Sequence, residues 1–180
     1  MEDKLKYSIV FLLFFITIIK GQDMKNELQV VNKVDLNKYK GLWYEVAKIP
    51  NWFQKKCLKN TTAEYSLRDD GKIKVVNSCI QSDGSKNVAE GVAKVVDNIS
   101  NAKLEVSFVR ILGIQLFWGD YWIIGLGENY DFALVGSPDR KYGWILSRTK
   151  KLPQEKLNII SDLLKIKGYD IKNFEFTEQD

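Results

Sequence analysis

From residue 41 onward, apolar and polar residues alternate with a period close to two, and turn signals recur roughly every dozen residues. The clearest hairpin covers residues 61–80, TTAEYSLRDDGKIKVVNSCI, where two alternating runs flank Asp70-Gly71, a favoured pair for a tight turn. The segments QSDGSKN, DNISNA, ENYD and PDRK separate the later runs. This pattern predicts about eight strands in a meander, a number typical of an up-and-down barrel or a sandwich.

The period changes once, over residues 152–168, LPQEKLNIISDLLKIKG. Pro153 near the start of this segment and Gly168 past its end are typical helix punctuation. Leu157, Ile160 and Leu164 fall on one stripe, so we expect one helix that packs on the sheet through this face. Residues 169–176, YDIKNFEF, then predict a short final strand.

The N-terminus differs in character from the rest of the chain. Lys4 and Lys6 precede an apolar run at residues 9–19, IVFLLFFITII, which is too short to span a bilayer as a helix and is typical of a secretory signal peptide. We therefore expect a signal peptide at residues 1–21, a leader at 22–35 and one domain at 36–180. An uncleaved N-terminal anchor is the alternative.

Composition narrows the chemistry of the site. Histidine is absent, which excludes a histidine-dependent triad and a histidine-bearing zinc site, and we expect neither a metal nor a cofactor. The formal net charge is +4, but lysine and arginine are scattered, so we expect no nucleic acid as partner. Weak attraction to an anionic membrane surface stays open.

The two cysteines, Cys57 and Cys79, are expected to pair in an exported protein. If the hairpin turn centres on Asp70-Gly71, Cys79 lies opposite Thr62, and a short fold-back brings Cys57 within disulfide reach. We expect the protein in the periplasm or at the outer membrane if it is bacterial, and secreted if it is eukaryotic. The sequence has no cysteine near residue 21, where a lipoprotein's diacyl anchor would be attached.

Four motifs, GLWYE at residues 41–45, DYWII at 120–124, YDFALVGSP at 130–138 and WILSRT at 144–149, occur in an informative order and spacing. With them the chain resembles the lipocalin family, in particular the bacterial lipocalins and the animal apolipoprotein D, from about Leu36 to Asp180. The resemblance implies an all-β fold. It consists of an eight-stranded antiparallel up-and-down β-barrel with one C-terminal α-helix packed outside and a short final strand.

The resemblance also assigns the closed end of the barrel. It implies that Trp43, two residues after Gly41, lies across this end and that Arg148 packs over its ring, a cation–π contact. By alternation Glu45 shares the inward face of Trp43, and a buried carboxylate needs donors, so we expect a polar network low in the cup. Trp52 and Phe53 follow Pro50 and are expected to form an aromatic lid at the open end.

Alternation outward from Arg148 puts Leu146 and Trp144 inside, and we expect Trp144 on the wall of a cavity. For the strand at residues 119–126 two phases are open, and the phase with Tyr121 and Ile123 inside is favoured over the phase with Trp122 and Ile124 inside. The further candidates for the cavity wall are Phe108 and Phe132. Plain core filling is the alternative role for all of these residues.

An apolar cup with few polar groups is the usual form of a small-molecule site. The resemblance implies a non-catalytic carrier or storage protein for a fatty acid or a lysophospholipid at the cell envelope. One alternative is an enzyme of the same fold that acts on a lipid through a free thiol of Cys57 or Cys79. Another is a structural protein with a filled barrel.

The run LGIQLFWGD, residues 112–120, is unusually apolar for a segment between strands. It is either a strand end that the fold buries or a patch at the rim that touches lipid or a second subunit. We therefore expect a monomer or a homodimer.

Overall fold

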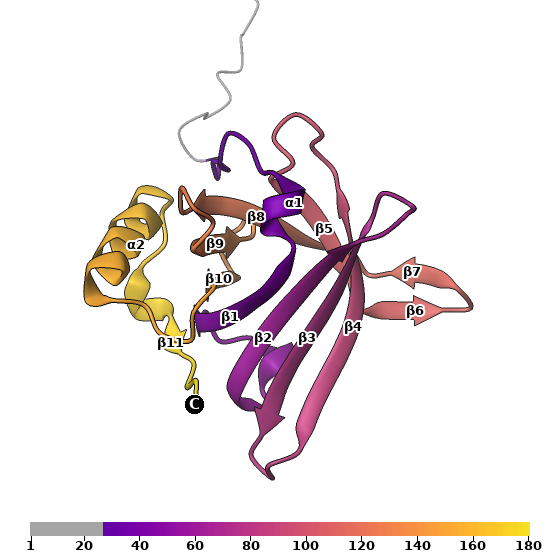
Figure 1. The fold of residues 1–180 in the computed structure, drawn as a ribbon, viewed down its shortest axis with the longest axis horizontal. Coiled ribbons are helices and arrows are strands. Elements are labelled where there is room, and N and C mark those ends of the chain that lie inside the picture. Colours follow the sequence, from indigo (N-terminus) through magenta and orange to yellow (C-terminus); the bar gives the residue numbers. More distant parts are fainter. Residues whose placement is uncertain (1–26) are drawn as a thin grey trace, which may run out of the picture.

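The computed structural model describes residues 27–180, and the predicted signal peptide lies outside the described residues. Within this part the chain forms a closed antiparallel barrel, in which each strand pairs with the next and β10 pairs back onto β1 (Figure 1). The barrel strands are β1 (Gly41–Lys48), β2 (Cys57–Leu67), β3 (Ile73–Gln81), β4 (Lys86–Val95), β5 (Lys103–Ser107), β8 (Gly119–Leu126), β9 (Phe132–Gly136) and β10 (Gly143–Ser147). The predicted eight-stranded up-and-down barrel is confirmed.

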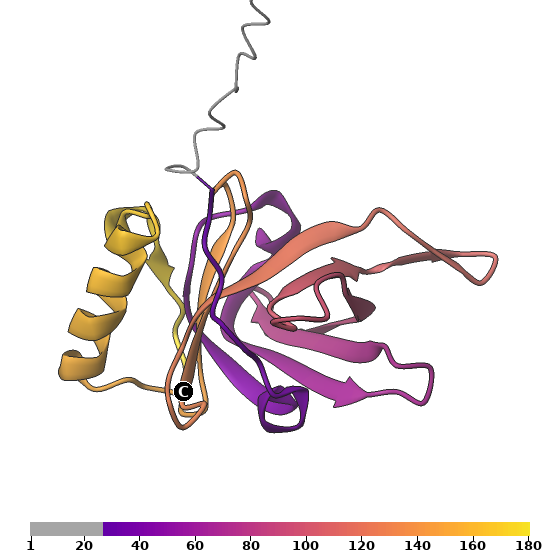
Figure 2. The same cartoon turned by 90° about the horizontal axis from the view of Figure 1, so that it is seen from above.

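Outside the barrel lies the helix α2 (Gln154–Ile166), which buries Ile160 and Leu164 against the outer face of the sheet. A separate two-stranded ribbon consists of β6 (Val109–Ile111) and β7 (Ile114–Leu116), and the apolar run at residues 112–120 covers its tip, β7 and the start of β8. Figure 2 shows α2 on one side of the barrel and this ribbon projecting from the opposite side. The predicted helix is confirmed.

The C-terminal segment closes a gap in the barrel wall. Beyond Tyr44 the strand β2 no longer pairs with β1, and β1 pairs there with β11 (Glu175–Phe176) through Ala47 and Lys48. The short helix η2 (Ile171–Asn173) precedes β11. Gln179 is buried in this gap, and its side-chain amide donates to the carbonyl oxygens of Glu45 and Thr61, 2.9 and 2.8 Å away.

Side chains pack in two layers. The inner cluster fills the closed half of the barrel and includes Trp43, while the outer cluster lies between the sheet and α2. Residues ahead of β1 also pack, since Leu28 and Val34 are buried and the Val34 amide donates to the Ser100 carbonyl over 2.7 Å. This segment belongs to the folded unit, although a leader was expected up to residue 35.

The short helix α1 (Leu36–Tyr39) leads into the closed end of the barrel. Trp43 is fully buried there, and the guanidinium carbon of Arg148 lies 3.7 Å from the centroid of its ring. The guanidinium also donates to four backbone carbonyls, those of Lys38, Tyr39, Lys40 and Leu42, over 2.6–3.1 Å. Gly41 adopts a φ of +95°, a left-handed conformation that glycine takes without steric cost, directly beneath this arginine.

Candidate ligand-binding cavity

A cavity of about 950 Å³ occupies the open half of the barrel. Its mouth lies among the segments that follow β1, β5 and β9, at the end opposite Arg148. The expected site residues that lie on its wall are Glu45, Trp52, Phe53, Phe108, Tyr121, Trp144 and Leu146. The deep wall between them is largely aliphatic, and this volume suits a ligand of drug or lipid size.

Two expected wall residues lie elsewhere. Phe132 packs in the outer cluster with Lys156 near its ring, because Ala133 and Val135 take the inward positions of β9. Every residue of β9 is buried, so both faces of the strand are apolar and the sequence does not indicate which residues point inward. The expectation that Phe132 lines the cavity was wrong. Ile123 points inward, as favoured, but is fully buried in the inner cluster and does not reach the cavity.

At the mouth, aromatic rings lie in contact. The short helix η1 (Trp52–Gln54) follows β1 and carries two of them. The ring of Phe53 lies 5.7 Å from that of Tyr142 and 6.3 Å from that of Trp144, and the last two rings stack on each other. Trp52 is 72% exposed at the outer edge of this group. The aromatic lid, defined here as Trp52 and Phe53, thus rests on the rim instead of filling the cavity.

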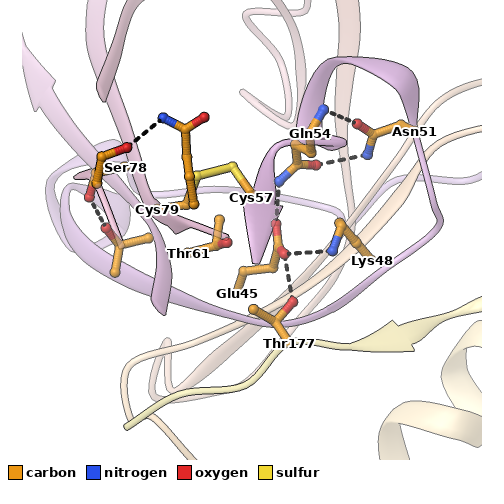
Figure 3. Close-up of a disulfide and its surroundings, with 12 residues drawn as sticks. Glu45, Lys48, Asn51, Gln54, Cys57, Thr61, Ser78, Cys79 and Thr177 are labelled. Atoms are coloured by element: carbon orange, nitrogen blue, oxygen red, sulfur yellow. Dashed lines mark hydrogen bonds and ion pairs between the residues drawn. A yellow bond between two sulfur atoms is a disulfide. The ribbon is translucent and has the colours of Figure 1, made fainter. Parts of the chain in front are cut away.

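Glu45 is only 3% exposed, and its carboxylate is satisfied by several donors (Figure 3). The Gln54 amide donates to it over 2.7 Å, the Thr177 hydroxyl donates over 2.6 Å, and the Lys48 ammonium lies 3.5 Å away. The Gln54 carbonyl oxygen in turn accepts from the indole N–H of Trp144 over 3.0 Å. The expected polar network exists, but it joins the barrel to the lid instead of lying low in the cup.

Asn51 adds a local reason for the lid's geometry. It caps η1, because its side-chain oxygen accepts from the backbone N–H of Gln54 over 3.0 Å, and its amide donates to the Gln54 side chain over 2.7 Å. Gln54 was not singled out from the sequence, although an Asn-x-x-Gln pattern after a proline is a capping signal that could have indicated it.

The predicted disulfide between Cys57 and Cys79 is confirmed, with the two Cα atoms 5.5 Å apart (Figure 3). It joins β2 to β3 three residues after Gln54, so the lid is tied both covalently and through Glu45. The register differs slightly from expectation, since Thr62 faces Ser78 rather than Cys79. Because the two sulfur atoms are bonded, the enzyme hypothesis has no free thiol in this structure.

Three tyrosine hydroxyls meet at the floor of the cavity, where Tyr121 bonds to Tyr39 over 2.7 Å and to Tyr65 over 2.9 Å. We call these residues the tyrosine triad. Burial raises the pKa of all three phenols, that of Tyr65 to about 12, so they stay protonated near neutral pH. The sequence indicated Tyr121 alone; for Tyr65, alternation from Ala63 along β2 was a usable signal.

The β6–β7 ribbon exposes its apolar side chains. Leu112 is 97% exposed and Phe117 is 78% exposed, and both have a positive φ, which is unfavourable for bulky residues. Leu112-Gly113 forms the tip, where Asn-Gly would be the favoured pair. Phe117 also lies on the cavity wall, so the ribbon's apolar surface is continuous with the mouth.

Within residues 27–180, no group of carboxylates, cysteines or histidines is arranged to hold a metal ion. Over the same residues, none of the helices has the length and apolar character needed to cross a membrane.

A family model described as a lipocalin-like domain matches residues 34–179. The chain belongs to the lipocalin family. Temperature-induced lipocalin-1 of Arabidopsis thaliana is 39% identical over 158 residues, which cover 86% of this lipocalin and 84% of the plant protein. Apolipoprotein D of Macaca fascicularis is 36% identical over 162 residues (84% and 80% covered). The outer membrane lipoprotein Blc of Escherichia coli is 38% identical over 151 residues (83% and 82% covered).

Among solved structures, insecticyanin from the tobacco hornworm Manduca sexta superposes with a TM-score of 0.69 at 25% identity, covering 86% of this chain and 85% of its own. The resemblance drawn from the four sequence motifs is therefore confirmed. Membership of this family makes the chain a binding protein for small hydrophobic ligands.

Proposed function

We propose that this lipocalin is a non-catalytic carrier or storage protein for an elongated lipid, either a fatty acid or a lysophospholipid. The observation that carries the proposal is the cavity of about 950 Å³, deep, largely aliphatic and rimmed by aromatic side chains. A long acyl chain fits such a shape, with its polar head at the mouth beside Trp144 and the lid.

The energetics support this ligand class. Each buried methylene contributes about 0.8 kcal/mol, so a sixteen-carbon chain gains roughly 12 kcal/mol. Association costs at least about 4 kcal/mol in lost freedom of motion. The difference of about 8 kcal/mol corresponds to a micromolar Kd.

We place the carrier at the cell envelope or outside the cell. The disulfide supports this location, since disulfides persist in oxidising compartments. Related proteins carry names such as outer membrane lipoprotein, and residues 1–21 have the pattern of a signal peptide. If the signal is cleaved after Gly21, N-terminal sequencing of exported protein gives Gln22 first; an intact Met1 would favour the uncleaved anchor.

The direct test of the site is a titration with a fluorescent long-chain fatty acid. Trp144→Ala should weaken binding about tenfold or more, because the ligand loses a large aromatic contact on the cavity wall. Trp122→Ala is the matched control, since Trp122 packs in the outer cluster, away from the cavity. Equal affinities of the parent and Trp144→Ala would remove Trp144 from the site, and absence of saturable binding to the parent would contradict the carrier function.

We further propose that the open end touches a lipid surface while the ligand is exchanged. Phe117 and Trp52 are exposed at the mouth and Leu112 is exposed at the tip of the adjoining ribbon, with the basic residues Arg110 and Lys55 near them in the sequence, which suits an anionic bilayer. The leucine at a left-handed turn position, where asparagine would be less strained, supports a role for that side chain outside the fold.

Co-sedimentation with phosphatidylglycerol vesicles tests the contact. Leu112→Asn should reduce the bound fraction several-fold without loss of stability, because asparagine tolerates a positive φ. Ile166→Asn, which changes another apolar residue that is 77% exposed at the end of α2, should bind like the parent. Equal binding of all three proteins would contradict the contact, and a dimer that Leu112→Asn dissociates would assign the surface to a second copy instead.

A further inference from the structure

The tyrosine triad places three hydroxyls at the floor of the cavity. Its members come from three separate elements, since Tyr39 ends α1, Tyr65 lies in β2 and Tyr121 lies in β8. The first two are only 4% and 7% exposed, so water reaches the group only through the cavity. The surrounding floor and lower wall are aliphatic, formed by residues such as Ile73, Val75 and Leu104.

Counting protons shows that the triad is not self-sufficient. Three hydroxyls bring three O–H donors, whereas the group contains two hydrogen bonds, both made to Tyr121. Whichever way the protons are arranged, one O–H remains. Among residues 27–180 no further acceptor bonds to any of these three hydroxyls. A buried donor without an acceptor is unfavourable, so the spare proton requires an acceptor that enters through the cavity.

The charge state fixes what that acceptor can be. The three phenols are neutral donors near neutral pH, because burial opposes their ionisation. A single neutral donor stabilises a hydroxyl or carbonyl oxygen adequately. It does not compensate the removal of a carboxylate from water, and the Arg148 guanidinium, whose charge also acts on Tyr39 and Tyr65, lies outside the cavity and donates to backbone carbonyls instead.

We propose that the tyrosine triad is a binding subsite for a neutral oxygen at the inner end of the ligand. This proposal rests on the carrier function above and narrows its ligand class. The favoured ligand is an elongated hydrocarbon that carries a hydroxyl or a ketone on the end that enters first. The head that remains at the mouth contacts the lid and Trp144 instead.

Two probes that differ only at the inner end test the subsite, hexadecanoic acid and 16-hydroxyhexadecanoic acid. An apolar floor would reject the hydroxyl and weaken binding at least about fivefold. In the parent protein we expect the hydroxylated acid to bind as tightly as the unsubstituted acid or more tightly. In Tyr39→Phe/Tyr65→Phe/Tyr121→Phe, which keeps the ring shapes and removes all three hydroxyls, the hydroxylated acid should bind at least about fivefold more weakly than hexadecanoic acid.

Two further variants separate a ligand subsite from a structural role. Tyr65→Phe leaves the hydroxyls of Tyr39 and Tyr121, which share one hydrogen bond, so one O–H still has no acceptor. The relative affinity for the two acids should therefore be the same as in the parent protein. Tyr44→Phe removes a hydroxyl from a tyrosine outside the cavity and should change neither affinity. Thermal unfolding of each variant reports whether it is folded. The comparison of the two acids in the parent protein remains a test of the subsite even where a variant does not fold.

The outcomes distinguish the two proposals. If both acids bind the parent saturably but the hydroxylated acid binds at least fivefold more weakly, the carrier function stands and the subsite is wrong. If the triple variant discriminates no more than the parent, the triad is likewise not the subsite. If neither acid binds the parent, the carrier function and the subsite both fail.

Discussion

At the scale of single residues, Arg148 provides hydrogen-bond donors to the backbone carbonyls at the closed end of the barrel. One guanidinium donates to the carbonyls of Lys38, Tyr39, Lys40 and Leu42 and covers the face of Trp43. Without it, these carbonyls and the bottom of the inner cluster would lose their cover. The cation therefore stabilises the fold from outside the cavity and does not line it.

Arg148→Ala should lower the free energy of unfolding by about 1–3 kcal/mol, through the lost cation–π contact and the unsatisfied carbonyls. Fatty-acid affinity should change little. Urea denaturation measures the first effect, and Arg68→Ala, which removes an exposed arginine paired with Asp70, should shift stability by no more than about 0.5 kcal/mol. A stable Arg148→Ala protein that has lost binding would mean that the ligand occupies the opposite end of the barrel.

The tyrosine triad predicts a dependence of stability on alkaline pH. Its phenols have raised pKa values in the folded state, that of Tyr65 moving from 10.0 to about 12. Their contribution is therefore complete below pH 10 and is lost as the pH rises through the folded pKa values, because the unfolded state releases its protons first. Urea unfolding between about pH 10 and 12 should show a steeper loss in the parent than in Tyr39→Phe/Tyr65→Phe/Tyr121→Phe. If the free energy of unfolding fell equally with pH in the parent and the triple variant, the phenols would ionise equally in the folded and unfolded states, contrary to this prediction.

At the scale of elements, the sequence predicted strands better than it predicted the face each residue occupies. Alternation works along β10, where Arg148 anchors the phase and where Trp144 and Leu146 do line the cavity. It fails in β9, where α2 covers the outer face and Phe132 is as apolar as its inward neighbours. The ribbon β6–β7 was not predicted, because the apolar run at residues 112–120 fits a buried strand end as well as an exposed patch; in the structure Leu112, Ile114 and Phe117 are exposed.

The disulfide and Gln54 act on the same element, the lid. Replacing Cys57 and Cys79 together by alanine should lower the free energy of unfolding by roughly 3 kcal/mol, the chain-entropy value for a loop of this size. It should also speed the release of a fluorescent fatty acid, because the segment after Gln54 loses its covalent tie to β3. Stopped-flow displacement measures the release rate. Reductant should reproduce both effects in the parent and leave the double variant unchanged; a parent insensitive to reductant would contradict this role.

At the scale of the whole molecule, the barrel combines a packed half and an empty half. Trp43 and its neighbours fill the closed half, whereas small residues such as Ala63, Ala89 and Ala93 leave space above them. The four sequence motifs indicated the lipocalin fold and the closed end of its barrel. They include positions where the backbone geometry requires a particular residue type, as at Gly41 with its positive φ. The gap between β1 and β2, filled by Gln179, could not be predicted because it depends on where two strands diverge.

The empty half of the barrel is expected to bind one elongated apolar ligand. Calorimetric titration of delipidated protein with hexadecanoic acid at several temperatures measures this binding. The predicted result is one acid per chain, a micromolar Kd and a negative heat-capacity change from the burial of apolar surface. Absence of saturable binding, several equivalent acids per chain, or a heat-capacity change near zero would contradict a ligand held inside the barrel.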